Sequence, residues 1–286
     1  MEIRSVDHVE MFVEDAERSA ACLRDCFGFA LAGRGGPRTG LRGCESVLLR
    51  QRDITILVTA ATSGDHRAAE FVRLHGDGVA VIGFGVDDAR ASFAEAVERG
   101  AVPAAPPETS GPGSGGVTFA SVIGFGDVEH RFVSRDRPDA PFAPVINEVG
   151  CGRSGSGLLR AIGHCAVCVP AGEGDATVRR YQETFGFRQI FGEPVPAPSR
   201  VVRSGSGMVT FTIREPDTAG DQGEADAFVD SYGGAGIQQI MFIGDDVTAG
   251  VRTRTEHGGR VLTFGGDDHH AHRATGGRRV GMGLRA

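Results

Sequence analysis

Residues 7–33, "DHVEMFVEDAERSAACLRDCFGFALAG", decide the fold, because a matching stretch occurs at residues 163–192, "GHCAVCVPAGEGDATVRRYQETFGFRQIFG". Each stretch reads as a strand that carries a histidine, then an amphipathic helix, then a Phe-Gly-Phe sequence that opens another strand. The match pairs His8 with His164 and needs a two-residue insertion before the second Phe-Gly-Phe. We therefore expect two copies of one structural unit.

A second pair of stretches supports the duplication. "HGDGVAVIGFGVDDARASFAEAVERGA" from His75 aligns with "GGAGIQQIMFIGDDVTAGVRTRTEHGGR" from Gly233 at a constant offset of 158 residues. This period is far too long for a solenoid. The patterns predict an α+β fold in which tandem βαβββ modules form two half-barrels. In the first module we expect strands near 3–13, 29–33, 44–50, 53–60, 78–87 and 117–134, and helices near 15–26, 66–75 and 88–99.

The chain divides into four segments. Residues 1–135 are the predicted N-terminal domain, 136–157 a Pro- and Gly-rich linker, 158–265 the C-terminal domain, and 266–286 an irregular tail. The first domain closes with "VTFASVIGFGDVEHRFVSR", whose counterpart would fall at about 275–293, but the tail shows no strand alternation. We expect the second half-barrel to lack its closing strand. The open sheet edge would then make it less stable, or be covered by a partner chain in a homodimer.

Composition limits the class of protein. The chain has 286 residues, 40% of them hydrophobic and 23% charged, and a formal net charge of −7, which argues against a nucleic-acid partner. No apolar run approaches the roughly 20 residues of a membrane helix, and the charged N-terminus does not resemble a signal peptide. The six cysteines read as reduced thiols. We expect a cytoplasmic protein with no membrane partner.

The stretch "GAGIQQI", residues 234–240, places two amides in succession on a predicted strand. Simple alternation puts Gln238 and Gln239 on opposite faces. Whichever amide points inward needs hydrogen-bond partners, because an unsatisfied buried amide costs about 1–3 kcal/mol.

Seven stretches occur in an order that resembles one known family. They are "VDHVEMFVED", "HGDGVA", "GFGDVEH", "GHCAVCV", "GFRQIF", "VTFTIREP" and "GGAGIQQI", and together they cover about residues 3–264. They resemble the vicinal-oxygen-chelate superfamily, in particular the branch with 4-hydroxyphenylpyruvate dioxygenase and 4-hydroxymandelate synthase. "VEMFVE" and "GFRQIF" are more similar to the mandelate synthases.

The resemblance implies a mononuclear Fe(II) enzyme of aromatic amino acid or secondary metabolism. Its partners would be a small aromatic 2-oxo acid, 4-hydroxyphenylpyruvate, and O₂. In the family, two histidines and a glutamate of the C-terminal half-barrel bind the iron and leave open positions for the 2-oxo acid and O₂. The product is homogentisate after ring hydroxylation or 4-hydroxymandelate after benzylic hydroxylation, and the motifs leave both open.

The resemblance also assigns candidate site residues. His164 stands at the position of the first metal ligand, and Gln239 stands where the family has its second histidine. Ser199 and Thr212 match positions that line the substrate cavity. The third ligand should come from the closing strand, yet no glutamate follows Glu256. With an amide in place of an imidazole and no third ligand, we expect Fe(II) to bind weakly or not at all, and no catalytic residue is assigned.

Other candidates receive a structural interpretation. His8 aligns with a ligand position, but its partners by symmetry are Val81 and Arg131, so we expect a structural role. The histidines 269, 270 and 272 of the tail form a small cluster of the kind that binds metals adventitiously.

Two further pairs are also read as structural. Cys165 and Cys168 lie three apart on a predicted strand and so face opposite ways, which disfavours a zinc or redox pair. Asp245-Asp246 would cap a following helix.

Three hypotheses therefore remain open. The chain is an Fe(II) dioxygenase of this family, a non-catalytic relative that binds a small aromatic acid or a protein partner, or a truncated or frameshifted product of an enzyme gene. The metal-ligand count separates the first hypothesis from the other two.

Overall fold

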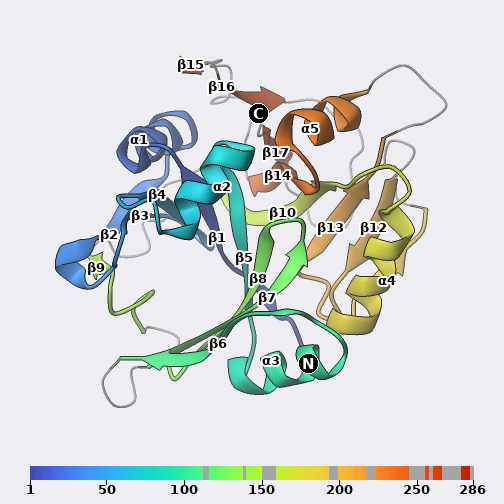
Figure 1. The fold of residues 1–286 in the computed structure, drawn as a ribbon, viewed down its shortest axis with the longest axis horizontal. Coiled ribbons are helices and arrows are strands. Elements are labelled where there is room, and N and C mark those ends of the chain that lie inside the picture. Colours follow the sequence, from blue (N-terminus) through green and yellow to red (C-terminus); the bar gives the residue numbers. More distant parts are fainter. Residues whose placement is uncertain are drawn as a thin grey trace.

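The computed structural model describes residues 1–111, 116–137, 140–149, 159–192, 199–216, 223–244, 255–257, 260–265 and 278–283. These residues form two sheets with helices packed against them (Figure 1). The elements of the first module lie to the left and bottom of the view, and helices α4 and α5 of the second module lie to the right. None of the helices in the described ranges has the length and apolar character needed to cross a lipid bilayer.

The first module has nine strands and three α-helices in its described residues. The strands are β1 (Ser5–Val13), β2 (Ala30–Gly35), β3 (Cys44–Gln51), β4 (Ile54–Ala61), β5 (Gly78–Gly85), β6 (Pro103–Ser110), β7 (Val117–Phe125), β8 (Val128–Arg135) and β9 (Asn147–Glu148). The helices are α1 (Ala16–Phe27), α2 (Arg67–His75) and α3 (Ala89–Glu98), with a short 3₁₀ turn η1 (Pro37–Thr39).

The second module repeats the first half of this order. Its strands are β10 (Leu159–Cys168), β11 (Arg188–Ile190), β12 (Ser199–Arg203), β13 (Thr210–Arg214), β14 (Gly236–Gly244), β15 (Thr255–His257), β16 (Arg260–Gly265) and β17 (Arg278–Gly283). Its helices are α4 (Gly174–Phe185) and α5 (Glu224–Tyr232).

The strand order confirms the duplicated α+β fold. The first sheet runs β6-β7-β8-β5-β1-β4-β3-β2-β9, and the second runs β11-β12-β13-β10-β14-β17-β16-β15. The run β2-β3-β4-β1-β5 therefore corresponds to β11-β12-β13-β10-β14. In both runs the histidine-bearing strand pairs in parallel on one side, with β4 or β13, and antiparallel on the other, with β5 or β14.

The repeated Phe-Gly-Phe sequence ends a helix in each module. Gly28 and Gly186 are the C-cap residues of α1 and α4, with φ of 73° and 70°, a left-handed conformation that glycine adopts without strain. The phenylalanines on either side are buried at 3–5% exposure, so each cap turns the chain between two core anchors. This geometry explains why the motif recurs.

The same strand irregularity also recurs. On β5 the register shifts between the partners of Glu10 and Met11, which leaves Ala80 unpaired; on β14 it shifts between the partners of Ala166 and Val167, which leaves Gln238 unpaired. Ala80 and Gln238 are 158 residues apart, the offset of the sequence repeat. A β-bulge at one position of both modules means that the duplication extends to local backbone distortions.

The sequence pattern missed two features of the first sheet. Residues 117–134 were predicted as one strand, but they form a hairpin, β7 and β8, that turns at Gly126 with φ of 51°. The strand β6 was not predicted because "PAAPPETS" contains three prolines. It lies at the edge of the sheet, where prolines are tolerated because an N–H group that faces outward has no partner strand.

The described part of the predicted linker packs on the first module. Phe142 and Ile146 are buried at 3% and 4% exposure, and Asn147–Glu148 form β9 beside β2. Glu148 also pairs with Arg50, with Oε2 and Nη1 2.8 Å apart. Residues 140–149 of the predicted linker therefore pack against the first module, because their few apolar side chains find a buried site that composition does not reveal. The division of the chain into domains stays a prediction.

The second module closes differently from the first. The neighbour of β5 is β8, which runs parallel to it, whereas the neighbour of β14 is β17, which runs antiparallel. No described strand of the second module thus repeats β8, as expected. Within the segment predicted as a tail, Arg278–Gly283 form β17, which pairs with β14 and places Met282 in the core at 0% exposure.

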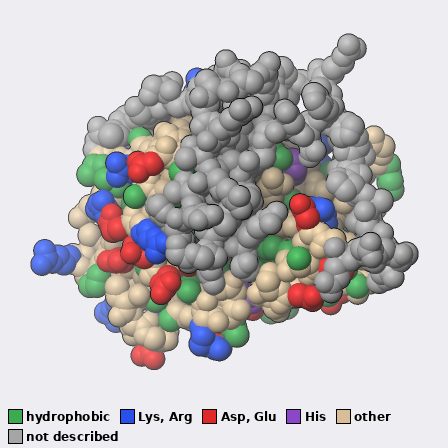
Figure 2. Space-filling view, turned by 90° about the horizontal axis from the view of Figure 1, so that it is seen from above, with side chains coloured by type: hydrophobic (Ala, Val, Ile, Leu, Met, Phe, Trp, Pro, Cys, Tyr) green, Lys and Arg blue, Asp and Glu red, His purple; other side chains and the backbone are tan. Residues whose placement is uncertain are grey.

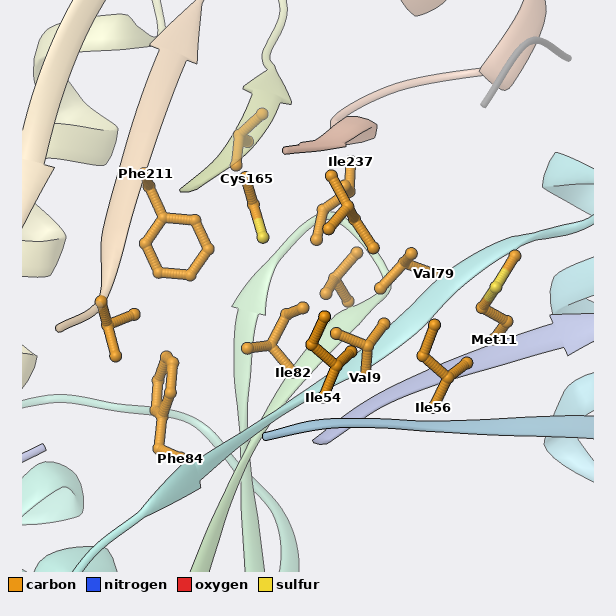
Figure 3. Packing of buried hydrophobic residues seen from close by; sticks show 14 of the residues in the cluster. Val9, Met11, Ile54, Ile56, Val79, Ile82, Phe84, Cys165, Phe211 and Ile237 are labelled. Atoms are coloured by element: carbon orange, nitrogen blue, oxygen red, sulfur yellow. The ribbon is translucent and has the colours of Figure 1, made fainter. Parts of the chain in front are cut away.

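One hydrophobic core connects the two modules. In Figure 3, Val9, Ile82 and Phe84 of the first module point toward Cys165, Phe211 and Ile237 of the second. Phe242 contacts the rings of Phe27 and Phe29, with centroid distances of 6.0 and 6.1 Å. The modules therefore share their apolar interior.

Buried polar contacts also cross between the modules. The hydroxyl of Tyr181 on α4 lies 2.7 Å from Nε2 of His130 on β8, and both side chains are fully buried. His75 on α2 contacts the carbonyl oxygen of Tyr232 on α5 through Nδ1 at 2.7 Å, and the two rings stack. Each contact fixes one helix of one module against the other module.

Candidate functional site

The four predicted site residues lie on one face of the second sheet. His164 is on β10, Gln239 on β14, Thr212 on β13 and Ser199 on β12. Thr212 and Gln239 flank Ala166 in register on its two sides. Because alternate residues of paired strands share a face, His164, Ala166, Thr212 and Gln239 point the same way. Ser199 joins them because it pairs with Arg214, two residues beyond Thr212. We call this surface the site face.

The opposite face of the second sheet is the core. Cys165, Val167, Phe211 and Ile240 point there and are buried at 0–2% exposure. The side chains of the site face are less enclosed: His164, Ser199 and Gln239 are partly exposed, and Thr212 is 7% exposed. The sheet therefore has one fully packed face and one face on which His164, Ser199 and Gln239 keep partial exposure.

The bulge in β14 places both glutamines on the site face. Ile237 and Ile240 both point into the core at 1% and 0% exposure, so the two residues between them share the other side. The expectation that Gln238 and Gln239 face opposite ways was therefore wrong. Alternation with a period of two holds only while each residue has one partner across the ladder, and the bulge adds an unpaired residue.

Gln238 is the amide with well-defined partners. Its Oε1 accepts a hydrogen bond from Nη1 of Arg214 at 2.8 Å and is 3.4 Å from Sγ of Cys168, and its Nε2 donates to the carbonyl oxygen of Glu224 at 3.2 Å. These contacts satisfy the requirement that a partly buried amide finds partners. They also fix the position of Arg214 at the edge of the site face.

The strands that carry the site face are rich in arginine. Strands β10 to β14 contain no Asp or Glu, while they contain five arginines and His164. The arginines are Arg160, Arg188, Arg200, Arg203 and Arg214. Arg200 is paired with Asp175 and Glu215, both at 2.6 Å. The nearest acidic contact of Arg214 in the described chain is the exposed Glu224, at 3.8 Å.

The described donors do not fit an Fe(II) centre. His164 offers an imidazole and Gln239 a neutral amide oxygen. The two residues lie diagonally across the neighbouring strands β10 and β14, so their Cα atoms are about 7–8 Å apart. Within the described ranges, no three His, Cys, Asp or Glu side chains come together as a metal site. A mononuclear non-haem iron site of this kind uses two imidazoles and a carboxylate. Asp267, His269, His270 and His272, and the predicted cap Asp245-Asp246, lie outside the described residues.

The first module has ion pairs at the corresponding positions. His8 is fully buried, with Nδ1 2.8 Å from Oδ1 of Asp7 and Nε2 3.3 Å from Nη1 of Arg131. Arg131 also donates to Oε2 of Glu10 at 2.8 Å. Symmetry predicted Arg131 as the neighbour of His8, and the structure places it there. In the first module, charged side chains thus occupy the positions that correspond to the predicted metal ligands of the second module.

The protonation of this cluster follows from its contacts. Burial lowers the pKa of His8, although the neighbouring Asp7 carboxylate acts in the opposite direction. Burial alone would raise the pKa of Glu10, but the charge of Arg131, the neighbouring His8 and hydrogen bonds from Thr59 and Arg131 together outweigh it, and the pKa is lowered. The cluster therefore holds an ionised Glu10 against Arg131 beside a neutral imidazole.

Cys165 and Cys168 belong to different parts of the core. Cys165 packs in the cluster shared by the modules, whereas Cys168 packs with Phe71, Phe228 and Tyr232. Burial raises the pKa of each thiol to about 12. The expectation that the two side chains point to opposite faces of the strand is confirmed.

Sequence reasoning missed Arg214 and Gln238 as parts of the site. Both stand in stretches that were singled out, "VTFTIREP" and "GAGIQQI". The available signal was the presence of arginines and the absence of acidic residues in five consecutive strand segments. Their mutual contact could not be predicted, because it depends on the bulge.

The face of the molecule that Figure 2 shows carries both signs of charge on its described residues. Figure 2, a view from above, shows acidic and basic side chains interspersed over the coloured part of this face. The coloured part of this face thus offers no extended basic patch of the kind that nucleic-acid binding requires. The absence of a nucleic-acid partner stays a prediction.

Comparison with known proteins adds independent findings. Residues 5–127 and 161–275 match the family described as "Glyoxalase/Bleomycin resistance protein/Dioxygenase superfamily". The chain is 28% identical over 272 residues to 4-hydroxyphenylpyruvate dioxygenase of Aspergillus fumigatus, with 85% of this chain and 68% of the relative covered. It is 27% identical over 272 residues to 4-hydroxyphenylpyruvate dioxygenase of Dictyostelium discoideum, with 90% and 74% covered.

A solved structure gives the same relationship. A triple mutant of 4-hydroxymandelate synthase from Streptomyces coelicolor superposes with a TM-score of 0.78 at 30% identity, covering 86% of this chain and 72% of that chain. Both modules of this chain are therefore matched by relatives of one kind.

Proposed function

Because the chain belongs to the glyoxalase, bleomycin resistance protein and dioxygenase superfamily, we propose that its site face binds a small aromatic 2-oxo acid of the 4-hydroxyphenylpyruvate type. The observation that carries this proposal is the arrangement of His164, Ser199, Thr212 and Gln239 on one face of the second sheet. The names of the relatives supply the ligand class.

The side chains of the site face suit such a ligand. The hydroxyl groups of Ser199 and Thr212 and the amide of Gln239 can hydrogen-bond a keto oxygen or a phenol. Ala166 and Met241 provide apolar surface on the same face, in register with Gln239 and His164. A few polar groups on a mostly apolar surface are typical of small-molecule sites.

Binding is tested by calorimetric titration of the purified chain with 4-hydroxyphenylpyruvate. Ser199→Ala and Thr212→Val should each weaken binding several-fold, because each removes a hydroxyl group and changes shape little. Thr118→Val is the matched control, since Thr118 lies in the first module and bonds Thr109. Unchanged affinity in both site variants, or no binding by the unmodified chain, would overturn the proposal.

A second candidate is Fe(II)-dependent dioxygenation of the same acid. The relatives' names and the superfamily favour it, and His164 and Gln239 are the residues of the site face that could contact iron. The donor set of the described residues does not support it, so binding is the function that we propose first. Oxygen uptake with added Fe(II) and ascorbate, together with identification of homogentisate or 4-hydroxymandelate, decides between binding alone and turnover.

A further inference from the structure

We propose that Arg214, held by Gln238, binds the carboxylate of the ligand, so that binding at the site face does not require a metal ion. This inference rests on the proposed function and specifies which group of the ligand is recognised, and where.

The first argument is the geometry of Arg214. In the described part of the chain both of its polar contacts, with Gln238 and with Glu224, are made by Nη1. A guanidinium group presents five N–H donors in a planar fork that matches a carboxylate. The edge formed by Nε and Nη2 is therefore the part of Arg214 that can form two parallel hydrogen bonds with an anion.

The second argument is positioning. The neutral acceptor Gln238 holds the guanidinium at 2.8 Å without neutralising it, while Gln238 is itself held by the carbonyl oxygen of Glu224. Arg214 is 21% exposed, so it is oriented by the fold and still accessible. A cation with these properties favours a charge-assisted hydrogen bond to an incoming carboxylate.

The third argument is charge. The strands β10 to β14 contain no acidic residue that would repel an anion or compete for the guanidinium. Glu224, the acidic contact of Arg214 within the described residues, is 68% exposed and 3.8 Å away, and such pairs contribute little.

The position of Arg214 also orients the ligand. Arg214 pairs in register with Cys168 on one side and with Ser199 on the other, while Gln239 pairs with Ala166. Measured along β10, the partner of Gln239 (Ala166) is two residues, about 7 Å, from the partner of Arg214 (Cys168). His164 is four residues, about 13 Å, from Cys168. A carboxylate at Arg214 and Ser199 places the aromatic ring of an arylpyruvate along Thr212 and Gln239, with its phenol toward His164.

The experiment measures the affinity for 4-hydroxyphenylpyruvate in the presence of EDTA and, separately, with added Fe(II). We expect the unmodified chain to bind in EDTA, and Arg214→Gln to weaken binding by about ten- to a hundredfold, as expected for loss of a charge-assisted pair. Arg214→Lys should recover part of the affinity, because it keeps the charge but loses the fork. Arg188→Gln, which removes an exposed arginine of the edge strand β11, should leave the affinity unchanged.

The outcomes separate the two proposals. Equal affinity of Arg214→Gln and the unmodified chain, or binding that appears only with Fe(II), overturns the role of Arg214 while the aromatic 2-oxo acid remains the ligand. No binding under either condition overturns both proposals. Binding of 3-(4-hydroxyphenyl)propionate through Arg214, without binding of the 2-oxo acid, supports the carboxylate site and overturns the proposed ligand class. A thermal melt of each variant, compared with that of Arg214→Lys, shows whether a loss of affinity reflects a loss of folding.

Discussion

Gln239 contributes a neutral amide to the site face, beside the strand that carries His164. An amide oxygen is a poor substitute for imidazole at Fe(II), and the described residues supply no carboxylate to balance the charge of an oxidised metal. At this scale the difference from a site of two imidazoles and one carboxylate lies in the chemistry of single side chains.

We expect Gln239→His to give little or no turnover of 4-hydroxyphenylpyruvate with added Fe(II) and ascorbate, because one more imidazole does not supply the carboxylate. Oxygen uptake with product identification measures this, with the unmodified chain in parallel. Turnover of about 1 s⁻¹ or more would contradict the prediction. It would indicate that residues such as Asp267, His269 or His270 complete the site.

His130 makes folding stability depend on pH. Burial lowers its pKa to about 3, so the folded state holds the neutral imidazole. In the unfolded chain the pKa is near 6.5, so between about pH 6.5 and 3 the unfolded state binds more protons. The stability contribution is therefore complete above pH 6.5 and is lost as the pH falls toward 3.

We expect His130 to reduce the free energy of unfolding by about 2 kcal/mol between pH 7 and pH 5. Urea denaturation at both pH values measures the loss, and His130→Gln should lack this part of it, because glutamine does not titrate. His8, whose pKa burial also lowers, contributes in the same direction in both proteins and does not affect the comparison. An identical pH slope in the two proteins would refute the assignment to His130.

At the scale of elements, the C-cap glycines explain how both modules turn from helix to strand. Gly186 has a φ of 70°, and a Cβ added there would meet only Nη1 of Arg99, at 3.9 Å. The cost of replacing Gly186 is therefore mainly backbone strain. The matching residue Gly28 is more confined, because its Cβ would lie 3.3 Å from Nε2 of Gln51.

We expect Gly186→Ala to destabilise the protein by about 1 kcal/mol, through the left-handed conformation alone. Gly186→Asn should cost less, since asparagine tolerates this conformation better. Equilibrium denaturation of the two variants provides the comparison. An equal or larger loss for Gly186→Asn would mean that contacts, and not backbone strain, determine the cost.

The molecule as a whole has one core for two modules. Phe242 packs on Phe27 and Phe29, and Phe84 packs on Phe185 and Phe211. The buried contact between His130 and Tyr181 joins the modules a second time. Loss of either module would expose apolar surface of the other and leave buried polar groups without partners.

We therefore expect both modules to unfold in a single transition. Differential scanning calorimetry should give equal calorimetric and van't Hoff enthalpies, the signature of two-state unfolding. Tyr181→Phe should lower the transition temperature without splitting the peak, because it leaves the buried imidazole of His130 without this partner. Two resolved transitions in the unmodified chain would show that the modules are energetically independent.

The amino-acid sequence by itself determined the duplication, the βαβββ order and the strands that carry His164, Ser199, Thr212 and Gln239. Periodicity and capping are local properties, so patterns such as Phe-Gly-Phe contain the information to predict them. The family resemblance, which the comparisons confirm, added the ligand class. The edge strand β6 was missed because its prolines are typical of loops, and tertiary pairing overrode them.

Only the tertiary structure decided which side chains of the site meet. The bulge at Gln238, the antiparallel β17 beside β14, the packing of residues 140–149 and the contact of His130 with Tyr181 all depend on partners that are distant in the chain. The same holds for Arg214: its charge is visible in the sequence, but its place on the site face depends on the register of β13 with β10 and on the amide that a bulge turns toward it. Such contacts arise from register and packing across strands, which no local pattern encodes.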